Sequence, residues 1–139
     1  MIDIGRSKRA ERAFSLDEVA IVPARRTRGP EEVSLQWQID AQSFDLPMVA
    51  APMDSIMSPA TAIEVGRLGG LGVLNLEGLW TRYADPEPLL EELAGIEDSV
   101  AATTRMQELY LEPIQPELIT ERLKQIRDAE VPVAGALSP

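Results

Sequence analysis

The spacing of apolar and polar positions predicts which segments of the chain form strands. Every second residue of the segment 33–39 is apolar, a pattern typical of a strand with one buried face. The short apolar run 19–22, which is followed by Pro23, is a second candidate strand upstream of it. We expect these two runs to pair as an N-terminal hairpin, with residues 24–30 as the loop that joins them.

A different pattern begins at residue 47, where the run 47–53 is apolar without interruption. Such a run is expected for a strand that is buried on both faces of a parallel sheet. Ser58-Pro59 has the residue types of a helix start, and Gly69-Gly70 has those of a helix end. The apolar segment 71–75 then predicts a second buried strand. Strand, helix and strand in this order form a βαβ unit, whose strands are parallel and whose crossover is right-handed.

The rest of the chain continues the alternation of helix and strand. Leucines fall on one face of the segment 86–93, and residues 116–129 have a clear amphipathic stripe, so both are predicted helices. Residues 101–111 have a weaker helical pattern. The apolar run 131–137 predicts a third parallel strand, after which the chain ends.

These elements predict an α/β fold that is the N-terminal portion of a (β/α)₈ barrel, with about three of its strands. A complete barrel needs eight strands and typically about 250 residues, whereas this chain has 139 residues. We expect residues 1–46 to hold the N-terminal segment and hairpin, and residues 47–139 to hold the first βα units of the incomplete barrel.

Composition excludes several classes of function. The chain has 13 basic and 23 acidic residues, a net charge of −10, which disfavours a broad nucleic-acid-binding surface. It has no histidine and no cysteine, so we expect no metal site and no catalytic residue within it. Seven of the 13 basic residues lie in segment 1–30, a tail or loop that can rest on the acidic body or contact phosphate. No apolar run reaches membrane-spanning length and no secretory signal is apparent, so we expect a cytoplasmic protein.

Three segments, taken in order, resemble the IMP dehydrogenase/GMP reductase family. Residues 14–23 (FSLDEVAIVP) resemble its N-terminal signature, and residues 46–55 (LPMVAAPMDS) resemble its first barrel strand, which ends in a Met-Asp pair. Residues 62–75 resemble its first helix and second strand. Many IMP dehydrogenases carry CBS regulatory modules before the third strand, but residues 94–130 are too few to hold them. The chain therefore resembles the branch of the family that lacks CBS modules.

The resemblance implies NAD-dependent oxidation of IMP to XMP, or alternatively NADPH-dependent reductive deamination of GMP to IMP. In both reactions a cysteine bonds to the purine C2 atom, and since this chain has no cysteine, the nucleophile would lie beyond Pro139. The phosphate-binding loops, most cofactor contacts and the potassium site would also lie outside the chain. The expected partners are a purine nucleotide and, in the complete enzyme, further copies of itself. The fragment alone would be inactive; a non-catalytic subunit that pairs its exposed strands with a full-length homologue is the alternative.

The resemblance also assigns substrate-binding residues at the carboxyl ends of the first two strands. Met53 matches a methionine that contacts the bound nucleotide, although a core methionine is an equal alternative. Asp54 would orient a loop or a ribose hydroxyl, or else serve only as a turn residue. Asn75 begins an Asn-Leu-Glu sequence where the family often has a histidine, one residue and an asparagine, and a simple strand-end turn is its alternative. Ala51 stands where some members have a nucleotide-contacting serine.

Overall fold

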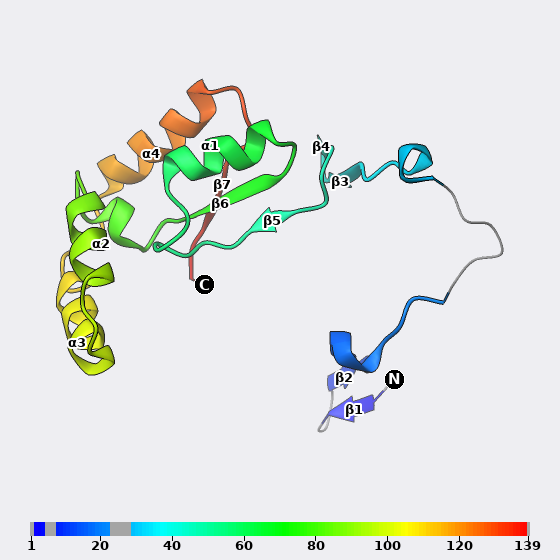
Figure 1. The fold of residues 1–139 in the computed structure, drawn as a ribbon, viewed down its shortest axis with the longest axis horizontal. Helices are drawn as coiled ribbons and strands as arrows, with labels where there is room; N and C mark the ends of the chain where they lie inside the picture. The colour runs from blue at the N-terminus through cyan, green and yellow to red at the C-terminus, as the bar shows by residue number, and fades with distance from the viewer. Residues whose placement is uncertain (1, 5–7, 23–28, 139) are drawn as a thin grey trace. The chain divides into compact units, whose positions relative to one another are not determined.

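The structure is a computed structural model that describes residues 2–4, 8–22 and 29–138 (Figure 1). The chain divides into two compact units, Met1–Val33 and Ser34–Pro139. The second unit holds the parallel sheet and all three residues predicted to bind substrate.

The described residues of the first unit form short elements. They are β1 (Ile2–Ile4), β2 (Lys8–Ala10), η1 (Leu16–Glu18) and η2 (Pro30–Glu32), of which β1 and β2 pair antiparallel. The strand predicted over residues 19–22 is wrong, because these residues pair with no strand in the described part of the chain and Ile21 is 97% exposed. Of the predicted loop 24–30, residues 24–28 lie outside the described part of the chain.

A β-hairpin opens the second unit, but it is not the predicted one. β3 (Trp37–Ile39) pairs antiparallel with β4 (Gln42–Phe44), so the strand in segment 33–39 finds its partner downstream rather than upstream. Asp40 takes a positive φ of 51° in the two-residue turn, a conformation that aspartate tolerates well. Trp37 packs against Phe44 with ring centroids 5.3 Å apart, and its Nε1 atom donates to the Leu46 carbonyl at 2.8 Å.

The parallel sheet confirms the predicted βαβ unit and the third strand. Its elements are β5 (Val49–Ala50), α1 (Pro59–Arg67), β6 (Leu71–Asn75) and β7 (Ala134–Ala136). β6 lies in the centre and pairs in parallel with both neighbours. β5 is shorter than the apolar run 47–53 predicted, and Val49 is 52% exposed, so the described chain does not cover both faces of this strand.

Helix α1 begins where its sequence predicts and packs on the central strand. Ser58 caps it, because its Oγ atom accepts a hydrogen bond from the Thr61 backbone N–H at 3.0 Å. The helix lies directly on β6, since a Cβ atom on Gly72 would come within 2.6 Å of the Ala62 Cα atom. Gly69 follows the helix with φ of 89°, which favours glycine.

The core lies between α1, β6 and α4 (Pro116–Asp128), and α4 also packs against the 3₁₀ turn η3 (Leu79–Thr81). The amphipathic stripe predicted for α4 is confirmed, because Leu118 and Ile126 are buried while its remaining apolar residues are partly buried. The buried core cluster consists of Met57, Ala62, Leu74, Leu76, Trp80 and Ile126.

Two further helices, α2 (Glu87–Ala94) and α3 (Ser99–Leu109), lie side by side beyond the ends of β5 and β6 (Figure 1). Asp98 caps α3 by accepting from the Ala101 N–H at 2.7 Å. Arg105 of α3 joins the two helices, because its Nε and Nη2 atoms donate to the two carboxylate oxygens of Glu92 at 2.6 and 3.1 Å. Within the described residues, no helix has both the length and the apolar character needed to cross a membrane.

Candidate functional site

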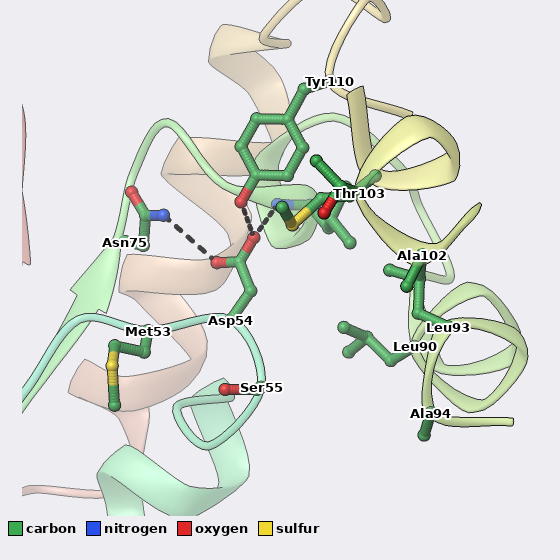
Figure 2. Close-up of a pocket in the computed structure, with 12 residues that line it drawn as sticks. Met53, Asp54, Ser55, Asn75, Leu90, Leu93, Ala94, Ala102, Thr103 and Tyr110 are labelled. Atoms are coloured by element: carbon green, nitrogen blue, oxygen red, sulfur yellow. Dashed lines mark hydrogen bonds between the residues drawn. The ribbon is translucent and has the colours of Figure 1, made fainter. Parts of the chain in front are cut away.

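Met53, Asp54 and Asn75 meet at one cavity of about 570 Å³ (Figure 2). Met53 and Asp54 follow β5, and Asn75 is the last residue of β6. The carboxyl ends of neighbouring parallel strands lie at the same edge of a sheet, so the residues that follow them come together there. The three predicted residues are thus neighbours in space although Asp54 and Asn75 are 21 residues apart in sequence.

The carboxylate of Asp54 is the centre of the hydrogen bonds at this cavity. Its Oδ1 atom accepts from Asn75 Nδ2 at 3.2 Å, and its Oδ2 atom accepts from the Leu79 N–H at 2.6 Å. Oδ2 also accepts from the Tyr110 hydroxyl at 2.6 Å (Figure 2). Three donors from three segments therefore hold this half-buried carboxylate. Hydrogen bonds to a charged acceptor are among the stronger ones in proteins, so the side chain is well fixed.

Both polar atoms of the Asn75 side chain form hydrogen bonds with other residues. Its Nδ2 atom donates to Asp54, and its Oδ1 atom accepts from the Glu77 N–H at 3.1 Å. The side chain thus closes a turn directly after β6, which is the turn role considered above for this residue. Met53 differs from both, because its side chain is 49% exposed and is absent from the buried core cluster. Its thioether is therefore the most available of the three groups.

Tyr110 was not predicted from the sequence, although it contributes a donor to Asp54. It directly follows α3, in the region 94–115 where the apolar pattern is weakest. Burial of the phenol and then its hydrogen bond to Asp54 raise the pKa of Tyr110 well above its ordinary value. The hydroxyl therefore remains protonated and able to donate throughout the physiological pH range. The Arg82 guanidinium lies over the ring, 5.2 Å from its centroid.

Glu77 and Ser138 tie the end of β6 to the end of β7. The backbone N–H and the hydroxyl of Ser138 donate to Glu77 Oε2 at 2.9 and 2.6 Å. These two bonds, the hydroxyl bond first, lower the pKa of Glu77 below its ordinary value. Neither residue lines the cavity described above.

The walls of the cavity are mainly apolar and come from α2, α3 and η3. Of the described residues that line it, none is lysine or arginine, so they provide no cation for a phosphate group. In the described part of the chain, no group of three or more His, Cys, Asp or Glu side chains is placed to hold a metal ion. The lining residues of α2, α3 and η3 are Leu79, Leu90, Leu93, Ala94, Ala102, Thr103 and Met106.

Comparison with known proteins finds relatives whose matched segments include Met53, Asp54 and Asn75. Residues 13–83 match the model of the IMP dehydrogenase / GMP reductase domain. An uncharacterized oxidoreductase of Mycobacterium tuberculosis is 46% identical over 143 residues, which cover all of this chain and 38% of the relative. The inosine-5'-monophosphate dehydrogenase of Staphylococcus aureus is 34% identical over 70 residues, which cover 50% of this chain and 14% of that enzyme.

A solved structure is similar in fold as well. The crystal structure of an IMP dehydrogenase/GMP reductase-like protein from Corynebacterium glutamicum superposes with a TM-score of 0.85 and 42% sequence identity. The match covers 99% of this chain and 38% of that protein. The chain therefore spans 38% of the length of the longer relatives that it matches from end to end. Since the domain match covers more than half of the chain, this protein belongs to the IMP dehydrogenase/GMP reductase family.

Proposed function

We propose that the complete protein is an NAD-dependent oxidoreductase that converts IMP to XMP, and that this chain forms part of its nucleotide-binding surface. In this proposal β5, β6 and β7 are the first three strands of a (β/α)₈ barrel. The observation that carries it is the single cavity that Met53, Asp54 and Asn75 share at the carboxyl ends of two parallel strands. Barrel enzymes place their chemistry at that end of the strands.

The three residues have different roles in this proposal. Met53 contacts the purine, because its side chain is half exposed, polarizable and not committed to the core. Asp54 and Asn75 shape the turn that carries Met53, because their polar atoms are already engaged by Leu79, Tyr110 and Glu77. They are thus positioning residues, and the reacting atoms belong to groups elsewhere in the protein.

The cavity fits a ring of a nucleotide better than it fits the phosphates. Its described lining is largely apolar and lacks lysine and arginine, whereas a pyrophosphate needs cations or an array of free N–H groups. In this proposal the groups that hold the phosphates of IMP and NAD come from outside this chain. When bound, NAD supplies the hydride acceptor. The residues described here exclude water from one side of the nucleotide and orient Met53.

An assay of the natural protein, at its native length, tests the proposal. We expect NADH formation with IMP, and a Met53→Ala variant whose KM for IMP is about tenfold higher, since a buried thioether contact is lost. Met48→Ala is the matched control, because Met48 is 52% exposed and does not line the cavity, so its KM should stay within about twofold of the wild-type value.

Other outcomes separate the alternatives. NADPH consumption with GMP, and no NADH formation with IMP, would indicate a GMP reductase-like enzyme instead. Neither activity, together with no binding of either nucleotide, would overturn the proposal. A protein limited to these 139 residues should be inactive in both assays, because it contains no cysteine to bond to the purine. A cytoplasmic location and an assembly of several copies are part of the same proposal.

A further inference from the structure

We propose that Tyr110 is a positioning residue, whose hydroxyl fixes the turn of Met53 and Asp54 and thereby sets the affinity for the purine nucleotide. This inference rests on the proposed function and adds a residue that lies outside the matched domain, which ends at residue 83. The key contact is the 2.6 Å hydrogen bond from the Tyr110 hydroxyl to Asp54 Oδ2, shown in Figure 2.

Asp54 is well placed to transmit this contact to Met53. The two residues are adjacent in sequence, and the Met53 carbonyl accepts from the N–H groups of Ile56 and Met57 at 3.0 and 2.8 Å. Met53 and Asp54 thus belong to one tight turn that leads into the core at Met57, which is 1% exposed. A rotation of the Asp54 carboxylate would shift this turn and the Met53 side chain with it.

Hydrogen bonds to the backbone at the end of α3 hold Tyr110, the donor of this contact, in place. Arg82 Nη1 donates to the Tyr110 carbonyl at 3.0 Å, and its Nε donates to the Glu77 carbonyl at 3.0 Å. The Tyr83 hydroxyl donates to the Leu109 carbonyl at 3.0 Å. The end of α3 is therefore anchored to the segment that follows β6, and the Tyr110 hydroxyl is directed at Asp54 from a rigid support.

Tyr110 is also needed to hold the carboxylate in place. None of the salt bridges found among the described residues includes Asp54. In this part of the chain its carboxylate is therefore held by hydrogen bonds and not by an ion pair. Without the Tyr110 hydroxyl, Oδ2 keeps the Leu79 N–H and Oδ1 keeps Asn75 Nδ2, both from the segment 75–79, and the space left by the hydroxyl is open to water from the cavity. The carboxylate then loses its hydrogen bond to the end of α3, and part of the preorganisation of the turn is lost.

The test compares two tyrosines, Tyr110 directly after α3 and Tyr83 after η3, whose hydroxyls both form hydrogen bonds near or from the end of α3, in the natural protein at its native length. Tyr110→Phe removes the bond to Asp54, whereas Tyr83→Phe removes a similar bond to the Leu109 carbonyl and leaves Asp54 untouched. Calorimetry measures the Kd for IMP and for GMP, and steady-state kinetics measures KM and kcat. We expect Tyr110→Phe to raise Kd and KM for the nucleotide about tenfold, with kcat within about twofold. Tyr83→Phe, which weakens the support of α3 but leaves the bond to Asp54 in place, should raise Kd and KM less, by about threefold at most.

A second variant, at Asp54, tests the same contact from its other side in case Tyr110→Phe also perturbs the folding of α3. Asp54→Ala removes the acceptor of the Tyr110 hydroxyl, and combining it with Tyr110→Phe should weaken binding no further than Asp54→Ala alone, because both changes break the same contact. Equal effects of the two tyrosine variants, or additive effects of Tyr110→Phe and Asp54→Ala, would overturn the inference and leave the proposed function standing. Failure of the wild-type protein to bind either nucleotide would overturn both.

Discussion

Gly78 lies directly against the carboxylate of Asp54: a Cβ atom at Gly78 would stand 2.0 Å from Asp54 Oδ1 and 2.5 Å from its Cγ. Both distances are far below van der Waals contact. The absence of a side chain at residue 78 is therefore what allows Asp54 to reach Leu79 and Tyr110. The glycine serves close approach here rather than an unusual φ, since its φ is −87°.

Adding a methyl group at this position should destabilise the protein and weaken nucleotide binding. We expect Gly78→Ala to lower the free energy of unfolding by about 2 kcal/mol, because the carboxylate must move away from its donors. Gly95→Ala is the control, since the nearest atoms to its Cβ are helix carbonyl oxygens at 3.5 and 3.6 Å. Urea unfolding should find the control within about 0.5 kcal/mol of wild type. Equal stability of the two variants would contradict the packing described here.

Arg122 should contribute more to the free energy of unfolding than an exposed arginine does. It is 8% exposed, and its Nε and Nη2 atoms donate to the carbonyls of Trp80 and Ala84 at 3.2 and 2.6 Å. We expect Arg122→Ala to lower the free energy of unfolding by about 3 kcal/mol, because two charge-assisted bonds are lost. Arg127→Ala, on the exposed side of the same helix, should cost less than about 1 kcal/mol. A similar urea midpoint for the two variants would argue against this role.

The raised pKa of Tyr110 predicts a loss of stability at alkaline pH. The folded protein keeps the phenol proton to a higher pH than the unfolded chain does, so the contribution of Tyr110 is fully present below the ordinary tyrosine pKa of about 10. It decreases as the pH rises from there toward the pKa in the folded state. Tyr110→Phe should abolish this part of the pH dependence, while Tyr83→Phe should retain it. Urea unfolding at a series of alkaline pH values measures the difference.

Glu77 should titrate below its ordinary pKa because Ser138 donates to it. Removing the hydroxyl with Ser138→Ala should raise the pKa of Glu77 only part of the way, since the backbone N–H bond at 2.9 Å remains. In the wild-type protein the contribution of this contact to stability is present above pH about 4.5 and is lost as the pH falls through the lower folded-state pKa. Carboxyl ¹³C NMR during an acid titration reads the pKa directly. An unchanged Glu77 pKa in the variant would show that the hydroxyl bond is not formed in solution.

Local signals in the sequence predicted the helices and the parallel sheet well. The start of α1 follows from Ser58-Pro59, and the packed face of α4 follows from its apolar period. The length of β5 was overestimated, because Pro47 and Pro52 have no N–H to donate and cannot pair throughout the run. The wrong hairpin has a different cause: strand pairing is decided by partners that hydrophobic patterning alone does not identify, and the true partner, β4, is largely polar.

The difference between local sequence patterns and contacts between distant segments also explains which residues of the site could be predicted. Met53, Asp54 and Asn75 follow apolar strands, so the topology of a parallel sheet was enough to bring them together. Tyr110 follows a helix whose apolar pattern is weak, and its bond to Asp54 spans 56 residues. No periodicity in the sequence relates the two, and only the folded arrangement of α3 against the strand ends does so.

The sequence separation between Asp54 and its hydrogen-bond partners has a consequence for folding during synthesis. Its three partners lie 21, 25 and 56 residues downstream, so during synthesis the carboxylate leaves the ribosome well before any of them. Closing the longest of these loops costs the most chain entropy, so we expect the Tyr110 bond to form after the contacts to Asn75 and Leu79. On this expectation the Met53 turn acquires its final geometry only once α3 has folded.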